Sequence, residues 1–316
     1  MDRGAIQSRR SWQESVRLYL EMVRFSHTLF ALPFALLALV WALVVPPPAG
    51  TELQVWSGLR WIGILLCMVT ARNFAMSVNR WSDARFDAIN PRTANRHIPS
   101  GKMTSQSVIL FGVANGLIFV ASCVLFLPNR LPLLLSLPVL VFIGGYSFAK
   151  RFTAAVHVWL GAALMLAPVC TWIALRGEGV VSDLRDIVPA VWLGFAVLLW
   201  VAGFDMIYAC QDEEVDRKIG LHSIASALGV PGALRISALC HAGTFFMLIT
   251  LGPIAPALSL GWIWNLTILV IGCLLAYEHS LVRPKDLSRV NIAFFHLNAV
   301  IGISVGIAGG VDAWLR

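Results

Sequence analysis

The chain has 316 residues, of which 58% are hydrophobic and only 13% are charged, and its mean hydropathy is +0.76. Soluble domains carry about 25% charged residues, and a chain of this size cannot hide so much apolar surface inside one water-exposed fold. The composition therefore excludes an ordinary soluble domain and indicates a protein embedded in a bilayer.

Nine apolar stretches approach the ~20 residues that a helix needs to cross the hydrocarbon core. They lie at 25–45, 56–78, 107–127, 131–149, 155–175, 188–210, 236–252, 256–277 and 290–311. The predicted fold class is therefore all-α, a polytopic membrane protein with nine transmembrane helices. We expect residues 1–24 to form a cytoplasmic N-terminal segment and residues 25–316 to form a single transmembrane domain.

The net charge of +7 is distributed unevenly among the segments that connect these helices. If the N-terminus is cytoplasmic, the cytoplasmic segments hold 18 of the 24 Lys and Arg residues; these segments are 1–24, 79–106, 150–154, 211–235 and 278–289. Such a bias is typical of the cytoplasmic side of membrane proteins. The basic pI of 9.4 is thus a signal of topology, and we expect no nucleic-acid partner.

Two long, charged segments interrupt the apolar pattern. On the first, residues spaced four apart share one helical face: Asn79, Asp83 and Asp87. On the second, residues spaced seven and four apart share a face: Asp205, Asp212 and Asp216. Carboxylates at one membrane depth repel each other unless a cation lies among them. Mg²⁺ fits because it takes oxygen ligands from one or two carboxylates and from substrate phosphate, whereas no His or Cys pair has the spacing that zinc requires.

The acidic segments follow the second and sixth expected helices, which have the same orientation. This arrangement predicts a parallel repeat of four helices. Many secondary transporters have inverted repeats and bind ions near the membrane midplane. The pattern therefore favours an enzyme, and a cation-coupled membrane transporter is the alternative from a different class.

The acidic motifs also carry a family resemblance. The first reads N-x-x-x-D-x-x-x-D followed by NPRTANRHIPSG, and the second is D-x-x-x-D within YACQDEEVDRKIG. Both resemble the UbiA superfamily of intramembrane prenyltransferases, and the similarity extends from Arg24 to the last expected helix. The segment YSFAKRFT at 146–153 resembles the short basic loop of that family. Arg80 stands where relatives often have the Asp of N-D-x-x-D. Within the superfamily, the chain is most similar to 4-hydroxybenzoate polyprenyltransferases.

The resemblance implies an enzyme of the bacterial inner membrane that acts in quinone biosynthesis. It would transfer a polyprenyl group from an allylic polyprenyl diphosphate to an aromatic acid such as 4-hydroxybenzoate and release diphosphate. In the alternative function, the enzyme prenylates 1,4-dihydroxy-6-naphthoate in a menaquinone route. The implied cofactor is Mg²⁺, held by Asn79, Asp83, Asp87, Asp212 and Asp216. The implied catalytic residues are Asp83, Asp212 and Lys150. The implied substrate-binding residues are Arg24, Arg72, Arg96, Tyr146, Arg151, Asp205 and Tyr208.

Arg72 lies inside an apolar stretch, seven residues and therefore two helical turns before Asn79. An arginine at that depth carries a large free-energy penalty unless it meets an anion or lines a polar cavity. Two anions are candidates, the side chain of Asp205 and the carboxylate of the aromatic acid, and the sequence does not decide between them.

Overall fold

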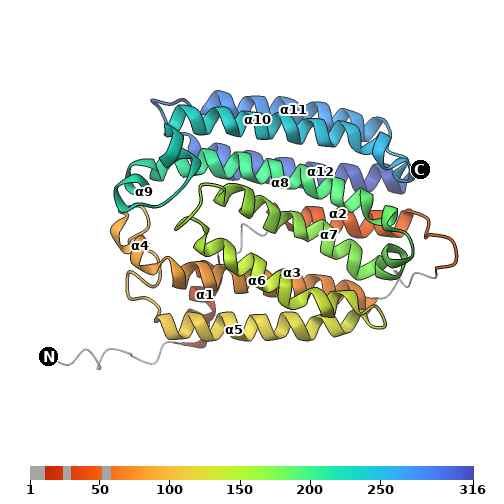
Figure 1. Ribbon diagram of the computed structural model, residues 1–316, viewed down its shortest axis with the longest axis horizontal. Coiled ribbons are helices and arrows are strands. Elements are labelled where there is room, and N and C mark those ends of the chain that lie inside the picture. The colour runs from red at the N-terminus through yellow and green to blue at the C-terminus, as the bar shows by residue number, and fades with distance from the viewer. Residues whose placement is uncertain (1–10, 24–29, 52–57) are drawn as a thin grey trace.

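The computed structural model describes residues 11–23, 30–51 and 58–316, and all statements below concern these residues. Within them the chain is nearly all helical, and the long helices run alongside one another (Figure 1). The helices are α1 (Trp12–Met22), α2 (Leu32–Val44), α3 (Gly58–Ser82), α4 (Ala84–Ile89), α5 (Ser105–Ser122), α6 (Leu131–Ala149), α7 (Val156–Ser182), α8 (Val188–Ala209), α9 (Glu213–Ile219), α10 (Ile224–Ile254), α11 (Trp262–Leu281) and α12 (Asn298–Trp314).

Eight helical segments in the described ranges are long enough and apolar enough to cross a membrane. They correspond to the second to ninth expected spans. α2 is a further apolar helix of 13 residues, and part of the first expected span lies outside the described residues. The predicted helical membrane fold is therefore confirmed, although some helix ends differ. α10 begins 12 residues before the expected limit of 236, and α7 continues to Ser182 instead of ending near 175.

The central helix of the bundle is α8, which packs between α7 and α10. It is the most buried of the spans, since most of its side chains contact other helices instead of lipid. Close approach to α7 depends on Gly161, where an added Cβ would overlap the carbonyl oxygen of Leu198. Small residues of this kind are what allow helix backbones to approach closely in membranes.

The extension of α7 beyond residue 175 lies at the end of the bundle where the C-terminus lies (Figure 1), and it begins with a buried ion pair. Arg176 has non-helical backbone angles, and its Nη2 atom lies 2.5 Å from Oδ1 of Asp186. The same guanidinium donates to the carbonyl oxygens of Ala42, in the last turn of α2, and of Val45 and Pro46, which follow the helix. Every polar atom must find a partner in this setting, so Arg176 joins α2 to the rest of the bundle.

The two acidic segments lie at the opposite end. α4 and α9 are neighbours there in Figure 1, and α3 and α8, which precede them in the chain, both run toward that end. This common direction agrees with the parallel relation expected between the two acidic helices, and it brings both motifs into one site.

Candidate active site

Both acidic segments contribute to one polar pocket of about 150 Å³. Eleven of the residues singled out from the sequence line it, from α3, α4, α6, α8, α9 and the segments that connect them. They are Asn79, Asp83, Asp87, Arg96, Tyr146, Lys150, Arg151, Asp205, Tyr208, Asp212 and Asp216. Arg24 lies outside the described residues. The structure thus gathers residues that are up to 137 positions apart in the sequence.

The first motif keeps its helical spacing although α3 ends at Ser82. The amide of Asp83 donates to the carbonyl of Asn79 at 3.0 Å, and the amide of Asp87 donates to the carbonyl of Asp83 at 2.8 Å. The Asn79 side chain also donates to Oδ2 of Asp83 at 2.7 Å. Burial, together with the neighbouring charge of Asp87, raises the pKa of Asp83 to about 6. A cation in the pocket would favour the ionised form of this carboxylate.

The surroundings of Asp87 also favour a positive charge close to its carboxylate. Its Oδ1 atom accepts a hydrogen bond from Nη1 of Arg96 at 2.7 Å. Its Oδ2 atom is buried and has no hydrogen-bond partner in the described structure. A buried carboxylate oxygen without a partner carries a desolvation penalty, which a cation or water could remove.

The second motif is held by residues that the sequence analysis did not select. Asn90 donates to Oδ1 of Asp212 at 2.8 Å, and Arg92 donates to both carboxylate oxygens of Asp212. Arg92 also donates from Nη1 to the hydroxyl of Tyr208 at 2.7 Å. Both Asn90 and Arg92 belong to the NPRTANR segment of the family resemblance, which is the signal that could have identified them.

Two basic residues after α6 face the same pocket. Nζ of Lys150 lies 3.1 Å from Oδ2 of Asp216, and Arg151 donates to the carbonyl of Ser82 at 2.9 Å. Burial alone would lower the pKa of Lys150, but the nearby carboxylates of Asp216 and Asp212 outweigh it and raise this pKa. Lys150 is therefore a permanent positive charge beside the acidic cluster.

Asp205 pairs with a histidine instead of with Arg72. Nδ1 of the fully buried His157 lies 2.7 Å from Oδ2 of Asp205. The amide of Ile224 donates to Nε2 of the same ring at 3.4 Å. Because Nε2 accepts, Nδ1 carries the proton and donates to the carboxylate. His157 gave no signal in the sequence because a lone histidine in an apolar stretch has no partner at a fixed spacing.

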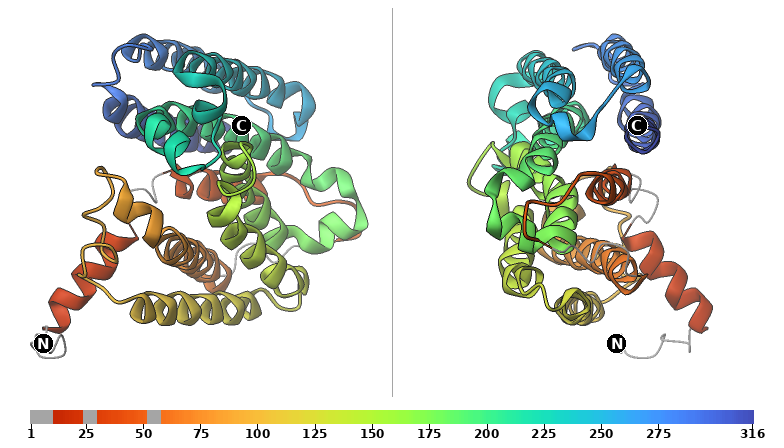
Figure 2. Two further views of the ribbon diagram at one scale, coloured as in Figure 1. Left: turned by 60° about the vertical axis from the view of Figure 1, so that its left-hand side comes forward. Right: turned by 90° about the vertical axis from the view of Figure 1, so that its right-hand side faces the viewer.

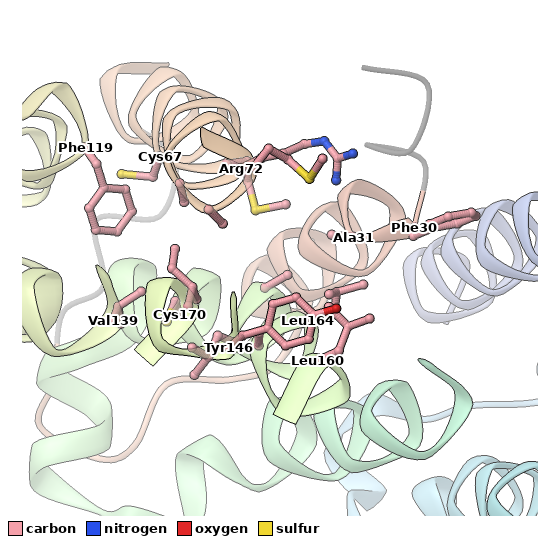
Figure 3. A pocket seen from close by; sticks show the side chains of 18 of the residues that line it. Phe30, Ala31, Cys67, Arg72, Phe119, Val139, Tyr146, Leu160, Leu164 and Cys170 are labelled. Carbon is pink, nitrogen blue, oxygen red and sulfur yellow. The ribbon is translucent and has the colours of Figure 1, made fainter. Parts of the chain in front are cut away.

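An apolar cavity of about 370 Å³ adjoins the polar pocket. Asn79, Arg96, Tyr146, Asp205 and Tyr208 line both spaces. Figure 3 shows Cys67, Phe119, Val139 and Cys170 around the cavity, on α3, α5, α6 and α7. Its lining reaches Phe126 and Pro132, toward the other end of the bundle. Such a shape suits a ligand with a charged head and a long apolar tail.

Arg72 lines the apolar cavity, close to the polar end. Its Nη2 atom donates to the carbonyl of Val23, directly after α1, at 3.1 Å. No ion pair between Arg72 and Asp205 occurs among the described residues, so the structural bridge considered from the sequence is absent in this form.

The pocket residues fit a magnesium ion that shares its ligands with a substrate. In the described ranges, no three His, Cys, Asp or Glu side chains are arranged to enclose a metal by themselves. Mg²⁺ rarely occupies an all-protein cage and is usually held by one or two carboxylates, substrate phosphates and water. The unpartnered oxygen of Asp87 and the raised pKa of Asp83 both indicate room for added positive charge.

Comparison with known proteins identifies the family to which the chain belongs. The family model described as UbiA prenyltransferase family matches residues 31–300. A 4-hydroxybenzoate octaprenyltransferase of Vibrio parahaemolyticus is 31% identical over 304 residues, covering 95% of this chain and 99% of the relative. An enzyme of the same name from Pseudomonas fluorescens is 31% identical over 277 residues, covering 82% and 88%.

Solved structures of UbiA homologs have the same fold as this chain. The apo structure of a UbiA homolog from Aeropyrum pernix K1 has a TM-score of 0.77 and 31% identity, covering 90% of this chain and 98% of the other. A UbiA homolog from Archaeoglobus fulgidus bound to GPP and Mg²⁺ has a TM-score of 0.67 at 17% identity, covering 93% and 99%, and shows the shared fold.

The apolar helices and the half-polar, half-apolar site define an integral membrane protein that handles an amphipathic ligand. The family model covers most of the chain, and its description identifies prenyl transfer as the activity of the family. The chain belongs to the UbiA prenyltransferase family.

Proposed function

We propose that this protein transfers a polyprenyl group from a polyprenyl diphosphate to 4-hydroxybenzoate, with release of diphosphate, as a step of quinone biosynthesis. One observation carries the proposal: the pocket lined by both acidic motifs opens into an apolar cavity that can receive a prenyl tail. The relatives named 4-hydroxybenzoate octaprenyltransferase support the choice of acceptor.

The polar pocket would hold the diphosphate. Lys150, Arg96 and Arg151 line it from two connecting segments and would contact phosphate oxygens. Asn79, Asp83, Asp87, Asp212 and Asp216 would hold Mg²⁺ against the same diphosphate; a homolog with the same fold is bound to GPP and Mg²⁺. When bound, Mg²⁺ would neutralise the charge that develops on the leaving diphosphate as the C–O bond breaks.

The apolar walls would then protect the allylic cation from water. Tyr146 and Tyr208 line the junction of the two spaces, where the reactive carbon of the donor would lie. Arg72 lines the same region from α3. A guanidinium binds a planar carboxylate through two parallel hydrogen bonds, so we assign Arg72 to the benzoate group of the acceptor.

The Asp205–His157 pair has a role in placing this machinery. The proton on Nδ1 of His157 fixes the orientation of the Asp205 carboxylate at the junction of the two spaces. Asp205 would thereby present its second oxygen to the substrates.

The remaining predictions from the sequence, on topology and domain extent, belong to the same proposal. We place the N-terminal segment 1–24 and the acidic segments on the cytoplasmic side of the bacterial inner membrane, and residues 25–316 in one transmembrane domain. The orientation rests on the distribution of Lys and Arg. The comparisons do not favour the two alternatives, which are prenylation of dihydroxynaphthoate and cation-coupled transport. Experiments can detect either one.

Removal of divalent metal tests the proposal directly. Diphosphate release should stop when purified enzyme with both substrates is treated with EDTA, and it should return when Mg²⁺ is added in excess. Undiminished release in EDTA would contradict the assigned role of the acidic residues. Cation-driven uptake by proteoliposomes without any prenylated product would instead support the transporter alternative.

A further inference from the structure

The helix α1, which precedes the apolar spans, has two apolar faces with different surroundings. At about 100° per residue, its apolar side chains cover an arc of roughly 200° that only Ser15 interrupts. One part of this arc, formed by Leu18, Tyr19 and Met22, packs on the bundle. The ring of Tyr19 stacks on Phe111 of α5 with a centroid distance of 4.5 Å.

The adjoining part of the arc is exposed in the described structure. It consists of Trp12, Val16 and Leu20, which are 80%, 36% and 50% exposed. We call these three residues the outer apolar face of α1. Gln13, Glu14, Arg17 and Glu21 lie on the opposite side of the helix and are exposed. An exposed tryptophan in line with two aliphatic side chains needs an apolar environment.

The orientation of α1 identifies that environment. The right-hand view of Figure 2 looks along the long helices, and α1 is seen there lengthwise. α1 therefore lies across the direction of the membrane-crossing helices, near the end of the bundle that carries α4 and α9 (Figure 1). Of the five arginines and three acidic residues in segment 1–24, α1 itself carries Arg17, Glu14 and Glu21, so the basic excess lies in the residues that flank the helix; such an excess favours an anionic surface. Tryptophan is also the side chain most typical of the membrane–water interface.

We propose that α1 lies in the headgroup region of the adjacent lipid leaflet, with its outer apolar face in lipid and its polar face in water. This position continues the lipid-facing surface of the bundle, because Ile109, Leu110 and Val113 of the neighbouring α5 are also exposed. A lipid surface is the occupant that explains the exposed apolar face, the crosswise orientation and the basic charge together.

The position of α1 matters because the helix touches the site at two points. The carbonyl of Val23, at its C-terminal end, accepts the hydrogen bond from Arg72. Its inner face also packs on Ile98 and Met103, in the segment that carries Arg92 and Arg96. Insertion of α1 into the leaflet would thus fix the Arg72 guanidinium. This second step rests on the proposed role of Arg72 as the acceptor-binding residue, whereas the lipid contact does not.

Spin labels test the lipid contact without any activity. In a Cys273→Ser background, which removes the exposed native cysteine, one cysteine at a time is placed at each position of the outer apolar face. Gln13→Cys and Arg17→Cys are the matched controls. In vesicles of zwitterionic and anionic phospholipid, oxygen should relax the labels of the outer apolar face and a water-soluble nickel chelate should not. The controls should show the reverse.

Two results would overturn the lipid contact. One is access of the nickel chelate to the outer apolar face equal to that of the controls, which would place the face in water. The other is exclusion of both reagents, which would show that a protein, such as a second copy of the chain, covers it.

Kinetics test the link to Arg72. Leu20→Glu should raise the KM for the aromatic acid about fivefold, the effect of one hydrogen bond, and leave the KM for the diphosphate unchanged. Gln13→Glu, which adds the same charge on the polar face, should change neither value. An unchanged KM in Leu20→Glu would overturn the link. If the parent protein showed no turnover, the proposed function would fail and the label result would remain.

Discussion

Alanine at Asp83 or at Asp212 should each abolish prenyl transfer, because both carboxylates line the pocket proposed for one metal–diphosphate group. The two residues come from different acidic segments, yet neither segment alone supplies the full set of ligands. Removing one member should therefore disable the group as a unit. The double variant should be slower than either single variant by less than about tenfold.

An ion pair of the same pocket gives the scale of one close charge interaction, and we take the loss to be of similar size. The Lys150–Asp216 pair has a separation of 3.1 Å. At about that distance and an effective dielectric constant of about 20, one unit charge contributes roughly 5 kcal/mol. Lys150 is one-third exposed, so solvent screens part of this energy. We expect a loss in kcat/KM of about a thousandfold, equivalent to about 4 kcal/mol.

Folding must be separated from catalysis in this experiment. Because the pKa of Asp83 is raised from 3.8 to about 6, its ionisation lowers stability progressively between these pH values, and fully above pH 6, when no metal is bound, so Asp83→Ala should not lower the Tm at pH 7. Asp212 is held by Asn90 and Arg92, and Asp212→Ala should lower the Tm. Asp212→Asn keeps one acceptor oxygen for Asn90 and for Nε of Arg92, loses the acceptor for Nη2 of Arg92, removes the charge and should be equally inactive.

Turnover is measured as prenylated acid formed by detergent-purified protein, with Tm from tryptophan fluorescence. Glu214→Ala is the matched control, because this carboxylate is close to Asp212 in sequence but pairs with Lys218 at the surface. It should keep wild-type activity. Near-normal turnover in either alanine variant, or losses that add in the double variant, would refute the shared site.

Other regions of the chain give further tests. Arg72→Lys should raise the KM for the aromatic acid about tenfold, since the two-pronged hydrogen bond is lost, with little change in the KM for the diphosphate; equal effects on both would contradict the assignment. Single cysteines in loop 88–95 should react with an impermeant maleimide only from the cytoplasmic side, and those in 178–183 only from the outer side. Gly161→Ala should lower the Tm by several degrees, because its Cβ would overlap the carbonyl of Leu198.

The fold was predictable because a bilayer imposes simple rules on a sequence. Each span must be about 20 residues of apolar helix, and the structure has helices at the expected places. The exact ends were harder to predict. The continuation of α7 past residue 175 depends on the pairing of Arg176 with Asp186 and with the carbonyls after α2, and these contacts have no local signature. α1 was also unexpected, since a short amphipathic helix lacks the long apolar run that marks a span.

The site was predictable to the extent that its residues repeat a spacing. Asp83 and Asp212 belong to two motifs with helical periodicity, and the structure brings these motifs together. Arg92 and His157 were missed because their roles arise from contacts with distant residues. Arg92 meets Asp212 across 120 positions, and His157 meets Asp205 across 48. Such pairs become visible only when the helices are packed.

The most direct test of the central claim is mass spectrometry of the product. Purified protein with Mg²⁺ is given an octaprenyl diphosphate and a panel of aromatic acids that includes 4-hydroxybenzoate and 1,4-dihydroxy-6-naphthoate. We predict a product with the mass of the octaprenylated 4-hydroxybenzoate, formed only with Mg²⁺ and absent with Asp83→Ala. Prenylation of the naphthoate alone would contradict the proposed acceptor, and the absence of any prenylated acid would contradict the account of this site as an aromatic prenyltransferase.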